Sequence, residues 1–222
     1  MKLSPSQLIH EIRVTIDGEG SAGTALRRIS KVKKRDPFKV LIATILSQRT
    51  RDENTDKAAG QLFALYPSAK ALARAPLRTV ERLIRPAGFY HVKAKKIKEV
   101  AEIITRQYGE MVPSDLESLL ELPLVGRKTA NCVLVYGFGK AAIPVDTHVH
   151  RISNRLGIAN TKTPEQTENQ LSQYFEKKYW VEVNEIMVRF GKNICRPIGP
   201  KCRICRLRSY CEWYTKHRAR DQ

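Results

Sequence analysis

The chain has 222 residues, of which 40 are Lys or Arg and 22 are Asp or Glu, a formal net charge of +18 at pH 7. No apolar run approaches the roughly 20 residues of a membrane-spanning helix, so no membrane association is expected. A positive surplus of this size favours a polyanionic partner, whose binding would weaken with salt through counterion release. The alternative is a basic surface that serves only solubility, or the charged composition of a thermophile.

Helical patterns dominate the chain. Residues 38–46 form an apolar run that predicts a buried helix, and residues 54–66 predict a second helix. Residues 92–108 place their apolar side chains on one stripe, which predicts a half-buried helix. Capping boxes at residues 114–117 and 163–166 each predict the start of a further helix. Because no hairpin signal or long alternating run appears, we expect an all-α fold.

The basic residues are clustered. Residues 27–35 and 93–98 are each dense in Lys and Arg, and residues 192–208 interleave basic side chains with cysteines. Such clusters strengthen the expectation that the partner is nucleic acid.

Residues 122–130 read Leu-Pro-Leu-Val-Gly-Arg-Lys-Thr-Ala and lie between two predicted helices, which indicates a tight helix–turn–helix connection. The N-terminus of the second helix would present backbone N–H groups suited to a phosphate oxygen. Gly126 would let a ligand approach the backbone, because it has no Cβ. A turn of this kind is more often a plain structural corner.

Lys128 lies in the first turn of that second helix. The helix dipole and the adjacent Arg127 both disfavour an ammonium there, but only slightly. Desolvation in a pocket would have to supply most of a shift toward a neutral amine. Lys128 is therefore a plausible nucleophile, and a phosphate-binding lysine is the alternative.

Asp146 precedes a helical run and is expected to be its N-cap. An ionised carboxylate at a helix start could also stabilise positive charge that develops in a pocket. Together with His148 and His150 it forms an Asp-x-His-x-His pattern that could bind a metal. The basic surroundings and the lack of nearby ligands favour packed or hydrogen-bonded histidines instead.

Four of the five cysteines lie near the C-terminus, spaced C-x6-C-x2-C-x5-C: Cys195, Cys202, Cys205 and Cys211. Thiolates on short loops can converge on one metal centre. Two disulfides are the alternative, but no signal-peptide pattern opens the chain, so a reducing intracellular environment is expected. Zinc and iron–sulfur centres both accept four thiolates, so the spacing leaves both open. Cys132 lies in an apolar helical run and is expected to be a core residue.

The turn at residues 122–130, the Val-Asp-Thr-His segment at residues 145–148 and the cysteine spacing together resemble the endonuclease III family of helix–hairpin–helix DNA glycosylases. The resemblance spans nearly the whole chain. It implies an all-α fold of two domains. One is a helical barrel domain at residues 29–140 that carries the hairpin, and the other is a discontinuous iron–sulfur cluster domain at residues 1–28 and 141–222.

Carried over to this sequence, the resemblance implies a catalytic lysine at Lys128, a catalytic aspartate at Asp146 and a [4Fe-4S] cluster on the four cysteines. It implies base-excision DNA repair by a bifunctional DNA glycosylase/AP lyase. Such an enzyme removes oxidised or ring-saturated pyrimidines of the thymine glycol type and cleaves abasic sites by β-elimination through a lysine Schiff base. The expected partner is double-stranded DNA with damaged bases or abasic sites, bound by a monomer in the cytoplasm in association with the nucleoid. The residues implied in DNA binding are Gln48, Arg49, Phe89, Leu124, Gly126, Arg127, Arg196 and Lys201.

Two positions depart from the family pattern. Leu124 stands where the family usually has glycine, so a positive φ there would strain the turn. Arg49 stands where glutamine is common, with Gln48 one place earlier, so either side chain could fill the gap left by a flipped base. Phe89 could stack in the opposite strand as a second wedge, or be a core aromatic.

Two other functions stay open. One is a mismatch glycosylase of the same superfamily, acting on thymine or uracil opposite guanine. The other is a non-enzymatic, zinc-tied DNA-binding module.

Overall fold

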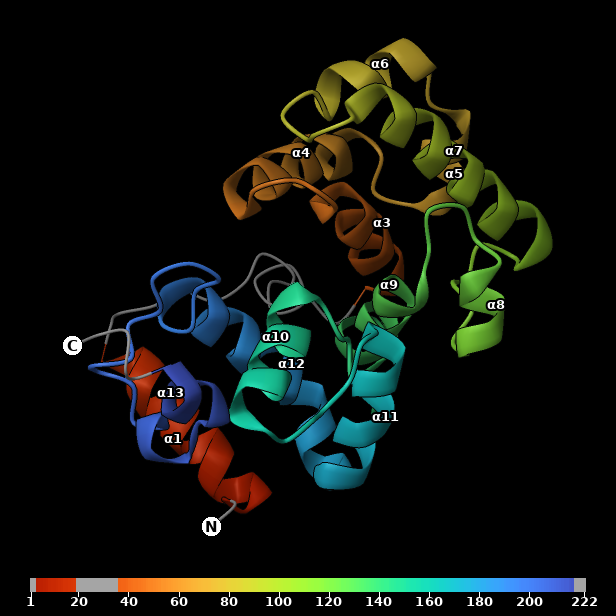
Figure 1. Ribbon diagram of the computed structural model, residues 1–222. Coiled ribbons are helices and arrows are strands. Elements are labelled where there is room, and N and C mark those ends of the chain that lie inside the picture. The colour runs from red at the N-terminus through yellow and green to blue at the C-terminus, as the bar shows by residue number, and fades with distance from the viewer. Residues whose placement is uncertain (1–2, 19–35, 218–222) are drawn as a thin grey trace. The chain divides into compact units, whose positions relative to one another are not determined.

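The computed structural model describes residues 3–18 and 36–217 (Figure 1). Within these residues every regular element is helical, which confirms the predicted all-α fold. No helix in these ranges is both long enough and apolar enough to cross a membrane. The chain divides into two compact units, which we name the hairpin unit (Ala25–Lys140) and the cysteine unit (Met1–Thr24 with Ala141–Gln222). The domain boundary predicted near residue 28 and the basic cluster at residues 27–35 lie outside the described residues.

The hairpin unit is built around α3 (Pro37–Ser47). Residues 40–46 of this helix are all buried, and it contacts four other helical elements of the unit. Burial on every side is expected for a helix that is apolar all round. The remaining helices that precede the hairpin turn are α4 (Asp52–Leu65), α5 (Ala69–Arg74), α6 (Leu77–Leu83), α7 (Tyr90–Gln107) and α8 (Leu116–Leu120). Of these, α5 and α7 lie side by side (Figure 1).

The three helices expected at residues 38–46, 54–66 and 92–108 are confirmed as α3, α4 and α7. The helix predicted to start at residues 114–117 is confirmed as α8, with Asp115 rather than Ser114 as its N-cap. Asp115 is the N-cap of α8, because its carboxylate accepts a hydrogen bond from the Ser118 N–H at 2.9 Å. The Ser114 hydroxyl is instead 2.9 Å from the ammonium of Lys140.

The hairpin turn is followed by α9 (Arg127–Cys132), which runs directly into the π-helical segment η1 (Val133–Phe138). Cys132 is fully buried at the junction, as predicted for a core residue. A Cβ on Gly137 would lie 3.0 Å from Pro37 Cα, so a glycine there lets η1 pack closely against the start of α3.

The cysteine unit contains α1 (Pro5–Asp17), α10 (Thr147–Leu156), α11 (Pro164–Tyr174), α12 (Lys177–Asn193), η2 (Arg208–Tyr210) and α13 (Glu212–His217). Helix α12 packs against both α1 and α10, and together they enclose an apolar core. The capping box predicted at residues 163–166 is confirmed, with Thr163 as the N-cap of α11 and Gln166 bonding back to it.

Candidate functional site

The hairpin turn joins α8 to α9 through two buried anchors, Leu122 and Val125, with Leu124 exposed between them. Leu124 has φ +59°, in the left-handed region that favours glycine. Gly126 caps α9 with φ −90°, which any residue can adopt, and a Cβ there would meet nothing within 4 Å. Neither backbone conformation nor packing therefore requires a glycine at 126. Because Gly126 has no side chain, a ligand has open access to the backbone of the turn.

Lys128 lies in the first turn of α9, as predicted, and is partly buried beside Arg127. The next residue, Thr129, is buried and accepts a hydrogen bond from the Gln48 side chain at 3.4 Å. The start of α9 is thus tied to the loop that follows α3.

That loop carries the two candidates for the flipped-base gap, and they differ in their contacts. The Gln48 side-chain amide also donates to the carbonyl of Leu124 at 2.9 Å, so it is engaged within the protein. Arg49 is exposed and has φ +50°. Its guanidinium carbon lies 5.7 Å from the centre of the Phe89 ring, which is itself 63% exposed. The structure therefore brings Arg49 and Phe89 together, and the expectation that Phe89 could be a core aromatic is wrong.

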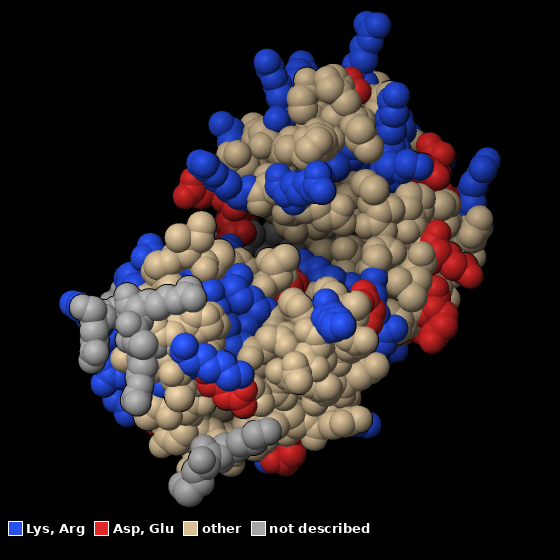
Figure 2. Space-filling model, in the orientation of Figure 1, with Lys and Arg blue, Asp and Glu red and all other residues tan. Residues whose placement is uncertain are grey.

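The basic cluster at residues 93–98 does not face solvent as a whole. The side chain of Lys93 is buried, with 3% of the residue exposed. The ammonium of Lys98 donates to the carbonyls of Ala73 and Ala75, at the end of α5. Two of these four lysines thus serve internal contacts, which the sequence pattern did not reveal. Elsewhere, Lys and Arg side chains are spread over the surface of both units on the face in Figure 2.

In the cysteine unit, Asp146 is the N-cap of α10, as predicted. One carboxylate oxygen, Oδ1, accepts hydrogen bonds from the backbone N–H groups of His148 and Val149, both at 2.9 Å. The cap therefore uses only one of the two oxygens. The side chain is partly buried.

The two histidines after Asp146 are hydrogen-bonded, as the sequence favoured. His150 Nδ1 lies 2.7 Å from the Thr167 hydroxyl, and His148 Nδ1 lies 3.1 Å from the Arg151 guanidinium. Burial lowers the pKa of His148, an effect that the nearby Asp146 carboxylate opposes. A neutral imidazole is thereby favoured at this position.

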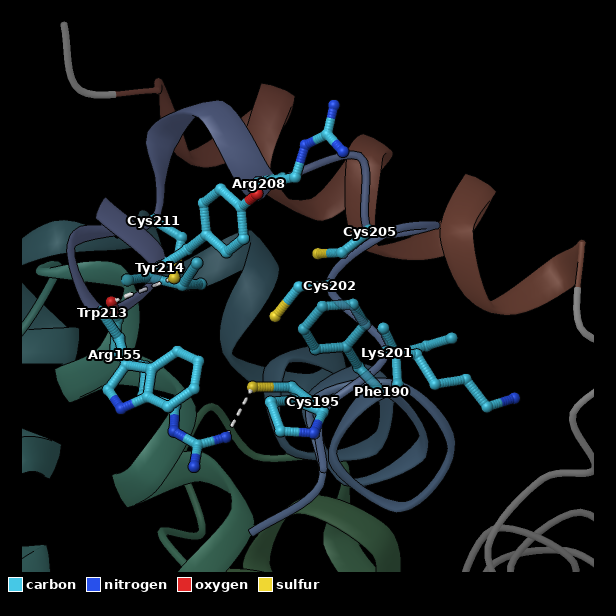
Figure 3. Close-up of a pocket in the computed structure, with 13 residues that line it drawn as sticks. Arg155, Phe190, Cys195, Lys201, Cys202, Cys205, Arg208, Cys211, Trp213 and Tyr214 are labelled. Atoms are coloured by element: carbon cyan, nitrogen blue, oxygen red, sulfur yellow. Dashed lines mark hydrogen bonds between the residues drawn. The ribbon is translucent and has the colours of Figure 1, made fainter. Parts of the chain in front are cut away.

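Cys195, Cys202, Cys205 and Cys211 line one pocket of the cysteine unit, and Figure 3 shows their sulfurs surrounding a common space. Burial raises the pKa of the Cys205 thiol to about 12, and the nearby Cys195, Cys211 and Cys202 add to the shift. Burial also raises the pKa of Cys211. Buried thiols such as Cys205 and Cys211 resist ionisation unless a bound cation compensates the charge.

Helix α10 holds this pocket through two arginines. Arg155 donates to the sulfur of Cys195 at 3.4 Å, and its guanidinium carbon lies 4.5 Å from the centre of the Trp213 ring (Figure 3). Arg151 donates to the backbone carbonyl of Cys195 at 2.9 Å. The helix that begins at Asp146 is thus fixed to the first cysteine of the set.

We name residues 196–201, between the first two of these cysteines, the basic loop. Arg155 donates to the carbonyls of Arg196 and Pro197, at 2.7 and 2.9 Å. Arg196 and Lys201 are both exposed, and Ile198 at the tip is 90% exposed. The guanidinium of Arg196 also donates to the carbonyl of Gly199 within the loop, at 2.9 Å. A loop with a fixed backbone and exposed cations is suited to phosphate contacts.

Comparison with known proteins agrees with these features. Residues 42–177 match the family model described as HhH-GPD superfamily base excision DNA repair protein. Endonuclease III of Thermotoga maritima is 51% identical over 184 residues, which cover 83% of this chain and 86% of that protein.

Two solved structures share the fold. A trapped endonuclease III–DNA covalent intermediate aligns with a TM-score of 0.83 and 32% identity, over 97% of this chain and 99% of the other. A thermostable thymine-DNA glycosylase aligns with a TM-score of 0.81 and 26% identity, over 95% and 96%. These alignments confirm the predicted helix–hairpin–helix glycosylase fold. The chain belongs to the endonuclease III family of the HhH-GPD superfamily, and it is a DNA glycosylase/AP lyase of base excision repair.

Proposed function

We propose that the protein removes oxidised or ring-saturated pyrimidines, of the thymine glycol type, from double-stranded DNA and cleaves the resulting abasic site by β-elimination. The observation that carries this proposal is a primary amine, Lys128, in the first helical turn after the hairpin. The chain also shares its fold with an endonuclease III trapped in a covalent complex with DNA.

The proposed chemistry uses two residues. The target nucleotide is flipped out of the duplex, because its C1′ is inaccessible in the stack. The neutral Nζ of Lys128 then bonds to C1′ as the glycosidic bond breaks, and the base leaves with the bonding electrons and is protonated. The Asp146 carboxylate stabilises the positive charge that develops on the sugar and assists in moving the lysine proton. Ring opening gives a Schiff base, which accepts electrons when C2′ loses a proton and the 3′ phosphate departs.

We further propose that the four cysteines hold a [4Fe-4S] cluster. Their thiols already surround one pocket, and a cluster takes one thiolate on each of four irons. A tetrahedral zinc ion also accepts four thiolates. What favours the cluster is the resemblance to the endonuclease III family, and the metal content of the protein distinguishes the two. When bound, the cluster would cross-link the loops of the cysteine unit.

The metal content can be measured directly. We expect the purified protein to be brown, with broad visible absorption and about four irons per chain. A colourless protein with stoichiometric zinc would contradict the cluster.

The remaining predicted residues are proposed to contact DNA. At the hairpin, phosphates would contact the backbone of Leu124 and Gly126 and the side chain of Arg127. At the basic loop, they would contact the side chains of Arg196 and Lys201. The engaged side chain of Gln48 would support the hairpin. The exposed Arg49 would fill the flipped-base gap, with Phe89 beside it as the second wedge. The hairpin unit would then be the helical barrel domain, and the cysteine unit the cluster domain.

Borohydride trapping tests the lyase step. We expect the wild-type protein to form a covalent adduct with DNA that contains an abasic site, and Lys128→Ala to abolish it. Lys57→Ala is the matched control, because Lys57 is an exposed lysine on α4 of the same unit. If a wild-type protein that binds this DNA gives no adduct, or if Lys128→Ala still gives one, the proposal is wrong.

Asp146→Asn separates the two roles of Asp146. Asparagine is about as good an N-cap as aspartate, so we expect unfolding and DNA binding to change little. Base excision should fall on the order of 10²-fold, because the charge facing the sugar is lost. Single-turnover excision and the Kd for the same duplex measure the two effects. Equal losses in both would show that Asp146 is only a cap.

The structural similarity to a thymine-DNA glycosylase keeps thymine-mismatch excision as a second candidate. Parallel single-turnover assays on duplexes with thymine glycol opposite adenine, and with thymine or uracil opposite guanine, separate the two. We expect thymine glycol to be removed fastest. Faster removal of the mismatched base would favour the second candidate. The zinc-tied binding module without activity is not supported, because the chain belongs to an enzyme family.

A further inference from the structure

The two loops that carry the proposed wedge residues lie against each other within the hairpin unit. The Gly88 N–H donates to the Thr50 hydroxyl at 3.0 Å. A Cβ on Gly88 would lie only 2.7 Å from the backbone oxygen of Arg49, so a glycine is required for this close approach. Arg49 and Phe89 are thus brought together by backbone packing as well as by their side chains.

The side chain of Lys93 holds the loop that carries Arg49 through hydrogen bonds from inside the hairpin unit. It lies in the first turn of α7, is 3% exposed, and its Nζ has three acceptors. These are the carbonyl of Leu46 at 2.7 Å, the carbonyl of Gln48 at 2.5 Å and the hydroxyl of Thr50 at 3.0 Å. An ammonium has three N–H donors, so each donor of Lys93 has one acceptor. The Leu46 carbonyl lies in the last turn of α3, where carbonyls lack helical partners and a cation is favoured.

The same network reaches the second loop and the hairpin turn. The backbone N–H of Lys93 donates to the carbonyl of Phe89 at 3.0 Å, and the Gln48 side chain donates to the carbonyl of Leu124. Phe89, Leu124 and Arg49 account for three of the four non-glycine residues with positive φ in the described part of the chain. Such conformations persist only where the surroundings impose them.

The enclosure of Lys93 bears on how it can act. Burial lowers its pKa to about 8, because desolvation disfavours the charged form. At pH 7 the side chain therefore stays mostly protonated and keeps its three donors. A side chain this enclosed cannot reach a phosphate, so its influence on DNA must pass through the loops that it holds.

We propose that Lys93 is a positioning residue that holds the loops around Arg49, Phe89 and Leu124 in the arrangement that inserts into duplex DNA. The DNA-facing half of this inference rests on the proposed function. The loop-holding half rests on the contacts of Lys93 alone, so the two can be tested separately.

Lys93→Met keeps the length of the side chain and removes the ammonium. Lys98→Met is the matched control, because Lys98 lies on the same helix and its ammonium likewise donates to two carbonyls at a helix end, those of Ala73 and Ala75. Amide hydrogen exchange at residues 46–51 and 87–90 reports on the loops. We expect exchange there to rise at least about tenfold in Lys93→Met and less than about twofold in Lys98→Met. Equal exchange in the two variants overturns the inference. Should Lys93→Met not fold, Lys93→Gln, which keeps an N–H donor group, takes its place.

The second readout compares two DNA substrates. Removal of thymine glycol from a duplex requires base flipping, whereas trapping on a single-stranded abasic oligonucleotide does not. We expect Lys93→Met to slow duplex excision at least about tenfold relative to Lys98→Met, and to change single-strand trapping less than about threefold. Parallel loss on both substrates would show a merely structural role and overturn the inference. If the wild-type enzyme excised no pyrimidine, the proposed function would fail, and the exchange experiment would still decide whether Lys93 holds the loops.

Discussion

Leu124 occupies a backbone position that suits glycine. Its φ of +59° lies in the left-handed region, which costs a residue with a Cβ roughly 1–2 kcal/mol. The residue is 37% exposed, so burial of the rest of its surface offsets part of this cost. The positive φ is therefore a requirement of the hairpin turn, which the sequence meets with a strained leucine.

Leu124→Gly is expected to raise the melting temperature or leave it unchanged, because relief of strain outweighs the loss of a partly exposed side chain. Leu120→Gly is the matched control. Leu120 is 40% exposed, but it lies in α8 with helical geometry, where glycine costs about 1 kcal/mol. Thermal unfolding of both variants measures the contrast. An equal fall in both melting temperatures would show that the turn does not strain Leu124.

At the scale of the element, the position of Asp146 depends on how α10 packs against α12. A Cβ on Gly191 of α12 would lie 2.6 Å from Nδ1 and 2.9 Å from Cβ of His148, which is in the first turn of α10. Arg151, one turn further along α10, donates to the carbonyl of the same Gly191 at 3.2 Å. The two helices therefore approach closely next to the Asp146 carboxylate, and only a glycine permits this.

Gly191→Ala is expected to destabilise the fold by about 1–3 kcal/mol, because the added methyl group forces His148 away. Excision should fall more than stability alone explains, since Asp146 moves with the helix start. Gly60→Ala is the control, because Gly60 lies in α4 and a Cβ there meets nothing within 4 Å. That change should stabilise the protein by roughly 0.5–1 kcal/mol. Chemical denaturation and single-turnover excision provide the test, and unchanged stability in Gly191→Ala would contradict it.

For the molecule as a whole, the sequence predicted what local chemistry determines. The helical spacing of apolar residues predicted α7, and the side-chain acceptor of Asp146 predicted the start of α10. Both features depend only on neighbours within a few residues. The inward turn of Lys93 could not be predicted, since its acceptors lie more than 40 residues away in the chain. The choice between Gln48 and Arg49 likewise depended on a contact with the distant Leu124. Long-range packing decides which of several similar polar side chains is held within the protein and which stays exposed.

The net charge of +18 predicts DNA binding that weakens with salt, and the basic loop should account for a defined share of that dependence. Each phosphate contact contributes about 0.9 to the slope of log Kd against log salt concentration. Replacing Arg196 and Lys201 with alanine should therefore reduce the slope by about 2.

The double variant Lys70→Ala, Lys178→Ala is the control for this test. It removes the same charge from lysines that form surface ion pairs, Lys70 with Glu110 at 3.1 Å and Lys178 with Glu176 at 2.8 Å. Its slope should stay near that of the wild type. Fluorescence titrations of one labelled duplex across a salt series give all three slopes. If the slope falls by the same amount in the two double variants, net charge governs binding, and the basic loop makes no specific phosphate contacts.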